Sequence, residues 1–163
     1  MFGEIFSMTE NELEVVDPVV MNLFVAQGIP ALAGLDVGYY VRLADEWGDD
    51  LRHRMPALEE EFRDNPSEWR DDIDYFRLGL VCWYVDMVLG IAYREDQRNL
   101  QRIRYTDPSD LFLNGVMDTR RGTCATLALL HVVLGRRIGL PVSRKRSRPV
   151  FRFCSSLARG CLG

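Results

Sequence analysis

The residue with the clearest chemical potential is Cys124, within the segment DTRRGTCATLALLHVVLGRRIGLP at 118–141. Thr123 is a good N-cap, which predicts that Cys124 takes the first position of a helix. Free N–H groups and the positive end of the helix dipole stabilise a thiolate there, and Arg120 and Arg121 add positive charge nearby. Cys124 therefore has the surroundings of a nucleophilic thiol. The alternative interpretation is a small residue that fits where a helix start meets another element.

Cysteine catalysis also needs a base, and the chain contains two histidines, His53 and His131. His131 follows Cys124 by seven residues, and two turns of helix separate such residues by about 10 Å, too far for a direct hydrogen bond. His131 lies in the apolar stretch LLHVVL and is predicted to be a packing residue. His53 lies in RHRMP and is predicted to be at the surface. Neither histidine is predicted to serve Cys124 as a base.

The sequence predicts no cofactor and no metal site. The four cysteines form no CxxC pair, and with two distant histidines they give no zinc or haem spacing. No G-x-G-x-x-G or P-loop pattern is present. Cys82 lies in an apolar run and is predicted to be a core cysteine.

Length and composition favour one ordinary soluble domain. The 163 residues are 47% hydrophobic and 27% charged, close to globular averages. The N-terminal stretch MFGEIFSMTENELE carries four glutamates and no basic residue, unlike a secretory signal. The chain contains no run of about eighteen uncharged apolar residues, the length that a helix needs to span a bilayer. We therefore expect a cytoplasmic protein without a membrane segment.

Helix signals dominate the first two-thirds of the chain. Asp17 followed by proline starts one helix, which Gly28 should end. Asp36 can cap a second helix, which we expect to end near Pro56 because proline disrupts a helix interior. A short acidic helix over 57–63 should follow.

The remaining elements are also predicted to be mostly helical. Ser67 should cap the longest helix, which runs to about Ala92. The charged stretch 93–104 is interpreted as a solvated helix end or connector, although arginine clusters can also bind anions. Asp107 restarts a short helix. The helix that begins after Thr123 should end at Gly139.

The segment YTDPSDLFLNGVMDTRRGTCATLALLHVVLGRRIGLPV resembles the bacterial transglutaminase-like superfamily, closest to its SirB-type branch. Members of that family start a helix with an R-x-G-x-C-type element, or a non-Cys equivalent, and end it with R-x-G-x-P. The stretches DPVVMNLFVAQGIP and WRDDIDYFRLGLVCWYVDMVLGIAYREDQR extend the resemblance, which covers roughly residues 15–143.

This resemblance implies a papain-like α+β core in which the cysteine helix packs on an antiparallel sheet. A histidine and an acidic residue on later strands would complete a Cys-His-Asp triad, and Cys124 matches the nucleophile position. The implied chemistry is attack of the thiolate on an amide or peptide carbonyl, followed by release of the thioester to water or an amine. The fold class expected for this chain is mainly α: the helical part of that α+β domain, over 1–143, with the sheet largely missing.

The chain departs from the family after residue 143. Residues 1–143 hold 14 basic and 24 acidic residues, a net charge of −10, whereas 144–163 hold six basic residues and no acid. We interpret 144–163 as a disordered or non-native tail, with a frame shift in the coding sequence favoured and a basic arm for nucleic acid or a membrane surface as the minor alternative. A short strand over 150–154 is expected at most. Because no histidine or aspartate of a following strand is present, we expect a truncated, inactive or nearly inactive form.

Two function hypotheses follow. The first is a transglutaminase-like cysteine hydrolase or acyl transferase that acts on an unknown peptide or amide substrate through Cys124. The alternative is a non-catalytic helical module whose exposed apolar face binds a protein partner or a second copy of the chain. A membrane partner is not expected, and a nucleic acid is disfavoured.

Overall fold

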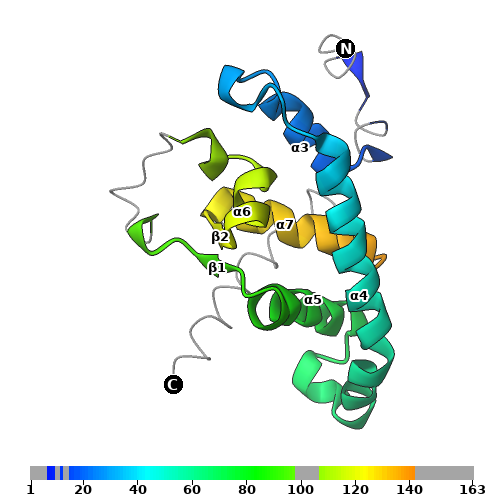
Figure 1. Cartoon of the computed structure of the whole chain (residues 1–163). Coiled ribbons are helices and arrows are strands. Elements are labelled where there is room, and N and C mark those ends of the chain that lie inside the picture. The colour runs from blue at the N-terminus through cyan, green and yellow to red at the C-terminus, as the bar shows by residue number, and fades with distance from the viewer. Residues whose placement is uncertain (1–6, 10–11, 13–14, 98–106, 142–163) are drawn as a thin grey trace.

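A computed structural model describes residues 7–9, 12, 15–97 and 107–141. The described part is mainly helical with one small two-stranded sheet, which confirms the predicted fold class (Figure 1). The longer elements are α3 (Pro18–Ala26), α4 (Val37–Asp64), α5 (Ile73–Trp83), β1 (Ala92–Tyr93), α6 (Leu113–Thr119), β2 (Arg121–Gly122) and α7 (Cys124–Arg137). Short 3-10 turns cover Pro30–Leu32, Pro66–Trp69, Glu95–Gln97 and Pro108–Asp110, and a π-helical turn covers Tyr84–Val88.

The central element is α7, which contacts α3, α4, α5 and α6 (Figure 1). Leu130 and Leu134 of its apolar stripe are fully buried, and Ile138 just beyond its end is 8% exposed. Side chains three and four residues apart share one face of a helix, so this stripe packs into the common core. The predicted start and end of this helix are confirmed: Thr123 caps it, and Gly139 follows its end with a φ of +79°.

Arg137, in the last turn of α7, ties that turn to two other helices. Its guanidinium pairs with Asp17, and its Nε lies 2.7 Å from Asp45 of α4. Asp17 also accepts the Val19 N–H at 2.7 Å, which confirms it as the N-cap of α3. Arg137, whose side chain is 15% exposed, therefore joins the end of α7 to the start of α3 and to the first half of α4.

Two buried tyrosines add polar links across the core. Tyr40 of α4 donates to Asp118 of α6 at 2.8 Å, and Tyr84 donates to Asp50 of α4 at 2.8 Å. Burial raises the pKa of both phenols well above the ordinary value, and the hydrogen bonds to the carboxylates raise it further.

The expected helix end near Pro56 is wrong, because α4 continues through Pro56 to Asp64. Pro56 is exposed, so the carbonyl of Arg52 that loses its partner faces water. The second half of α4 is held instead by tertiary contacts. Glu59 accepts a hydrogen bond from Arg77 of α5 at 2.7 Å.

The expected helix start at Ser67 is also wrong. Ser67 lies in a 3-10 turn, and α5 begins after Asp72, which accepts the N–H groups of Asp74 and Tyr75. Arg70 and Asp71 have left-handed φ values of 59° and 56°, which a continuous helix cannot contain. The single long helix to Ala92 is likewise interrupted, since a π-helical turn follows α5 and Gly90 leaves it at a φ of +63°.

The charged stretch expected to be a connector from Tyr93 contributes to a parallel sheet. The Ala92 N–H donates to the Arg120 carbonyl at 3.1 Å, and the Arg94 N–H donates to the Gly122 carbonyl at 2.9 Å. Residues 98–106 and 142–163 lie outside the described residues, and so do the strand expected over 150–154 and the basic tail.

The helix expected after Asp107 is a 3-10 turn followed by α6. The Asp107 carboxylate accepts the Ser109 N–H at 2.9 Å, so its capping role is confirmed although the helix after it is interrupted.

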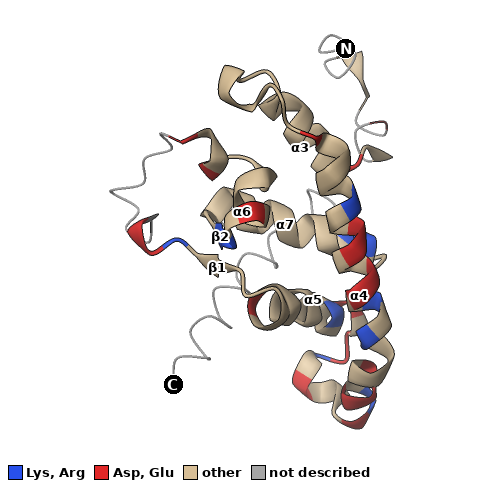
Figure 2. Cartoon of the chain, viewed as in Figure 1, with Lys and Arg blue, Asp and Glu red and all other residues tan. Residues whose placement is uncertain are grey.

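Charged residues are frequent along the ribbon of α4, whereas the visible part of α7 is mostly uncharged (Figure 2). This contrast matches a central helix buried against its neighbours and a peripheral helix with one face in water. Within the described ranges, no helix is long and apolar enough to cross a membrane.

The contact between α4 and Arg137 predicts an unusual effect of one glycine. A Cβ at Gly48 would lie 2.5 Å from the Arg137 Cβ. Gly48→Ala should lower the free energy of unfolding by roughly 1–3 kcal/mol through overpacking, although alanine favours helix. Gly38→Ala in the same helix meets side-chain ends at 3.2 and 3.3 Å, which need to move by only a few tenths of an ångström, and should cost less than Gly48→Ala. Urea unfolding of both variants checks this, and a stabilised Gly48→Ala variant would contradict it.

The buried tyrosines predict a loss of stability at alkaline pH. Because their folded pKa is raised, the unfolded chain releases these protons first, at about pH 10. Their contribution to the free energy of unfolding is therefore complete below about pH 10 and is lost as the pH rises further. A Tyr40→Phe, Tyr84→Phe double variant should lose the part of this dependence that these two phenols supply, whereas exposed Tyr39→Phe should keep it. Urea unfolding on both sides of that pH measures it, and equal curves for all three proteins would refute it.

Candidate functional site

The start of α7 is fixed by a buried capping box. The Thr123 hydroxyl accepts the Thr126 N–H at 3.4 Å, and the Thr126 hydroxyl accepts the Thr123 N–H at 2.9 Å. Both threonines are almost completely buried. Cys124 consequently occupies the first helical position, as predicted from the sequence.

Asp110 connects this cap to the rest of the site. Its carbonyl accepts a hydrogen bond from the Thr123 hydroxyl at 2.9 Å, and its carboxylate, on a residue 5% exposed, pairs with Arg94. Arg94 also reaches Asp96 at 2.9 Å, and this hydrogen bond lowers the pKa of the Asp96 carboxyl. The residue after β1 and the cap of α7 are thus held together through one buried residue, Asp110, whose carboxylate binds Arg94 and whose carbonyl binds Thr123.

Gly122, immediately before the cap, is required by close packing. A Cβ there would lie 2.7 Å from Leu127 Cγ and 2.9 Å from Val116 Cγ2. Its φ is outside the left-handed region, so packing and not backbone conformation requires the glycine. The absence of a side chain lets β2 run directly against α6 and α7.

The structure brings Tyr93 to Cys124. Tyr93 pairs with Gly122 in the small sheet, which brings it close to Cys124, two residues further on. Burial, followed by the charge of Cys124, raises the pKa of the Tyr93 phenol. Sequence reasoning missed Tyr93, because no local spacing links it to a residue 31 positions later; parallel pairing with Gly122 does.

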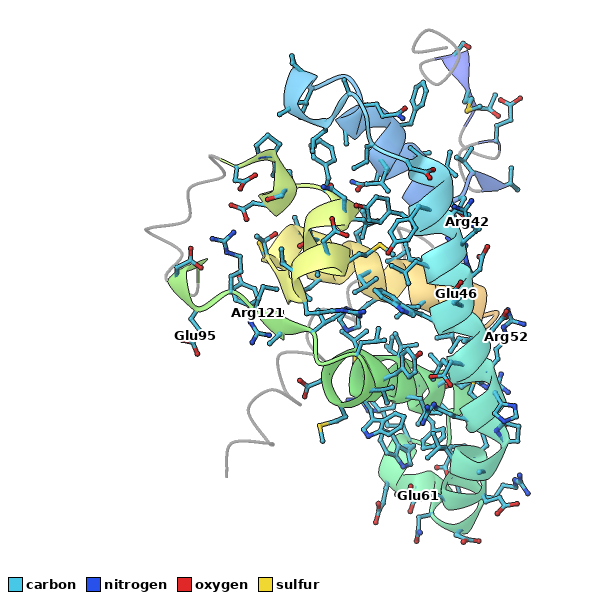
Figure 3. All side chains as sticks on the ribbon, in the orientation of Figure 1. Arg42, Glu46, Arg52, Glu61, Glu95 and Arg121 are labelled. Carbon is cyan, nitrogen blue, oxygen red and sulfur yellow. The ribbon has the colours of Figure 1, made fainter. Side chains whose placement is uncertain are left out.

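A cavity of about 740 Å³ lies at this end of the sheet, and Tyr93 is one of its lining residues. Cys124 does not line it. Arg121 and Glu95 lie at this end of the molecule, away from the labelled charged residues of α4 (Figure 3). The lining residues are Ala92, Tyr93, Arg94, Glu95, Asp96, Thr119 and Arg121.

The two arginines expected to add positive charge near Cys124 have other partners. The Arg120 guanidinium lies 4.6 Å from the centre of the Trp47 ring. Arg121 donates to the carbonyl oxygens of Gly90 and Arg120 at 3.5 and 3.2 Å. Both therefore contribute to packing and to the β1–β2 connection.

Both histidines lie where the sequence predicted. His131 is 8% exposed, and its Nδ1 lies 2.6 Å from the Leu127 carbonyl oxygen, so Nδ1 carries the hydrogen. His53 is exposed on α4. Cys82 is buried in the core, as predicted. Among the described residues, no group of histidine, cysteine and acidic side chains could hold a metal ion.

A known protein family matches the part of the chain that contains this site. The Transglutaminase-like superfamily matches residues 49–144. The chain belongs to this superfamily. The match contains Tyr93, Cys124 and His131, while the resemblance seen over 15–48 lies outside it and stays a prediction. Neither a curated protein nor a solved structure matches the chain.

Because the superfamily match includes Cys124, the start of α7 is the candidate functional site. Cys124 is partly exposed, stands at a helix N-terminus and follows by two residues the strand position that pairs with Tyr93. Its role as the nucleophile stays a prediction from the resemblance.

The buried cap predicts a local effect of Thr123→Val. The variant loses the hydroxyl that bonds to Thr126 and Asp110, which should cost about 1–2 kcal/mol of unfolding free energy. Amide hydrogens in the first turn of α7 should also exchange faster. Thr123→Ser keeps the hydroxyl and should show a smaller loss. Urea unfolding and peptide-resolved hydrogen exchange measure both effects, and equal behaviour of the two variants would contradict the capping role.

Proposed function

We propose that this chain carries the helical part and the nucleophile of a transglutaminase-like cysteine hydrolase or acyl transferase of the SirB type. Cys124 is the nucleophile, and the substrate is a peptide or other amide. The observation that supports this most is the place of Cys124 at the first position of α7, within the region matched by the superfamily. A helix N-terminus favours the thiolate, the nucleophilic form.

The chemistry divides into two steps with different needs. The sulfur attacks the carbonyl carbon, and the bond to the leaving group breaks to give a thioester. An amine leaving group must gain a proton at this point, and a base must activate the water or amine that resolves the thioester. His131 is two turns away along α7 and bonded to Leu127, and His53 lies exposed on α4, so neither fits that task.

This division predicts acylation without turnover. With a p-nitrophenyl ester, whose leaving group needs no proton, the chain should release about one equivalent of nitrophenol in a burst and then stop. With a p-nitroanilide of the same acyl group, release should be absent or at least about a hundredfold slower. Absorbance measures the burst, and mass spectrometry of tryptic peptides locates the acyl group on Cys124.

Matched cysteine variants control this experiment. Cys124→Ser should abolish the burst, whereas Cys82→Ser removes a buried thiol and should retain it. A burst that survives Cys124→Ser, or an acyl group found elsewhere, would refute the proposed role.

The competing proposal is a non-catalytic interaction module. Trp83 and Met87 support it: they are four residues apart on consecutive helical turns, 37% and 68% exposed. Apolar side chains in such a position suit a protein partner or a second copy of the chain. Absence of acylation at Cys124, together with concentration-dependent association that Met87→Ser abolishes, would favour this alternative.

A further inference from the structure

We propose that the cavity beside β1 and β2 binds a short peptide with free ends: Arg121 binds its terminal carboxylate, and Glu95 binds its terminal ammonium group. The proposal goes beyond the function above and requires nothing of Cys124, which does not line the cavity. It concerns binding alone, which can be measured without any acyl transfer.

The small sheet fixes the backbone of the cavity wall. Arg121 of β2 lies opposite Ala92 of β1. Hydrogen bonds of 3.1 and 2.9 Å join the two strands at both ends of their overlap. The charged side chains of the cavity therefore project from a defined backbone.

Arg94 is already neutralised within this wall. Its Nε and Nη2 donate to the Asp96 carboxylate at 3.1 and 2.9 Å, and its Nη1 donates to the buried Asp110 carboxylate. One cation thus faces two carboxylates, and every nitrogen of its guanidinium has a partner. Arg94 and Asp96 therefore hold the wall together and leave the binding of a ligand to the other charged residues.

Arg121 is a cation that can still bind a ligand. Its Nη1 donates to two backbone carbonyl oxygens, those of Gly90 and Arg120, at 3.5 and 3.2 Å. Among the described residues, its Nε and Nη2 have no partner and no carboxylate pairs with it. Two parallel N–H groups of a guanidinium match the two oxygens of a carboxylate. Backbone carbonyls therefore orient Arg121 and leave its bidentate edge unused.

Glu95 supplies the opposite charge. It is exposed in the 3-10 turn after β1, and no cation pairs with it in the part of the chain that the structure describes. Glu95 and Arg121 lie at the same end of the molecule, away from α4 (Figure 3). Such a wall favours a molecule that carries both charges over a phosphate or another polyanion, which Glu95 and Asp96 would repel.

The spacing along the wall favours a peptide over a free amino acid. Glu95 comes three residues after Ala92, the partner of Arg121, and three residues of strand span at most about 10 Å. The two charged groups of a free amino acid are attached to a single carbon atom, whereas each residue of an extended peptide adds about 3.3–3.6 Å. The cavity of about 740 Å³ has the size of a small-ligand site, and Ala92 and Tyr93 give it an apolar wall for peptide side chains.

The test is a ligand-detected NMR titration of the full chain with alanylalanine, its N-acetyl form, its C-terminal amide and free alanine. Alanylalanine should bind best, because it alone offers both charges at a peptide spacing. The amide lacks the carboxylate and should bind roughly tenfold more weakly. The N-acetyl form lacks the ammonium group and should bind about threefold more weakly. Free alanine should also bind more weakly than alanylalanine.

Matched variants assign these preferences to the two side chains. Arg121→Gln should weaken the binding of alanylalanine roughly tenfold and remove its advantage over the amide. Glu95→Gln should remove its advantage over the N-acetyl form. Arg42→Gln and Glu61→Gln make the same charge changes at exposed positions of α4 and should leave all affinities unchanged.

Two results on the wild-type chain would overturn the proposal: no saturable binding of any probe, or another probe that binds as tightly as alanylalanine. A folded Arg121→Gln variant with the wild-type affinity would overturn it as well. If circular dichroism shows that this variant is unfolded, the comparison of probes on the wild-type chain decides. Cys124→Ser should bind alanylalanine as the wild type does, so this outcome is independent of the acylation experiment.

Discussion

The position of α7 is the constraint on which the rest of the structure depends, and it is fixed at both ends. At the start, the buried hydroxyl of Thr123 bonds to the Asp110 carbonyl, and Asp110 is neutralised by Arg94. At the end, Arg137 pairs with Asp17 and Asp45. Because four helices pack on α7, these two polar attachments also set how those helices meet. The attachment at the start of α7, between Thr123 and Asp110, fixes the position of Cys124.

The caps at Asp17, Asp36 and Thr123 could be predicted from the sequence because a cap acts over only two or three residues. The same logic fails where two candidate caps compete. Ser67 and Asp72 both precede an apolar periodic run. The helix begins only after Asp72, because the backbone between the two candidates is left-handed. The burial of Cys82 and His131 was also predictable, since apolar neighbours surround both in the sequence.

Long-range contacts explain what the sequence could not show. A proline such as Pro56 normally signals a helix end, but packing of α4 on α5 continues past it. Strands as short as β1 and β2 carry no recognisable periodicity, and 29 residues separate the pair Ala92–Arg121. Tyr93 was therefore indistinguishable from the charged stretch that follows it. The need for glycine at position 122 is also invisible in the sequence, because only packing reveals the close approach of Leu127.

The same long-range contacts give the two arginines before the cap a structural role. The sequence suggested Arg120 and Arg121 as the nearby positive charges, but one stacks on Trp47 and the other bonds to backbone carbonyls. Arg121 nevertheless lines the same cavity as Tyr93 and Arg94, together with the acidic residues Glu95 and Asp96. Charges of both signs therefore surround the space next to the start of α7. The short pairing of β1 with β2, with Arg94 held by Asp110 and Asp110 bonded to the Thr123 cap, sets where these side chains stand relative to Cys124.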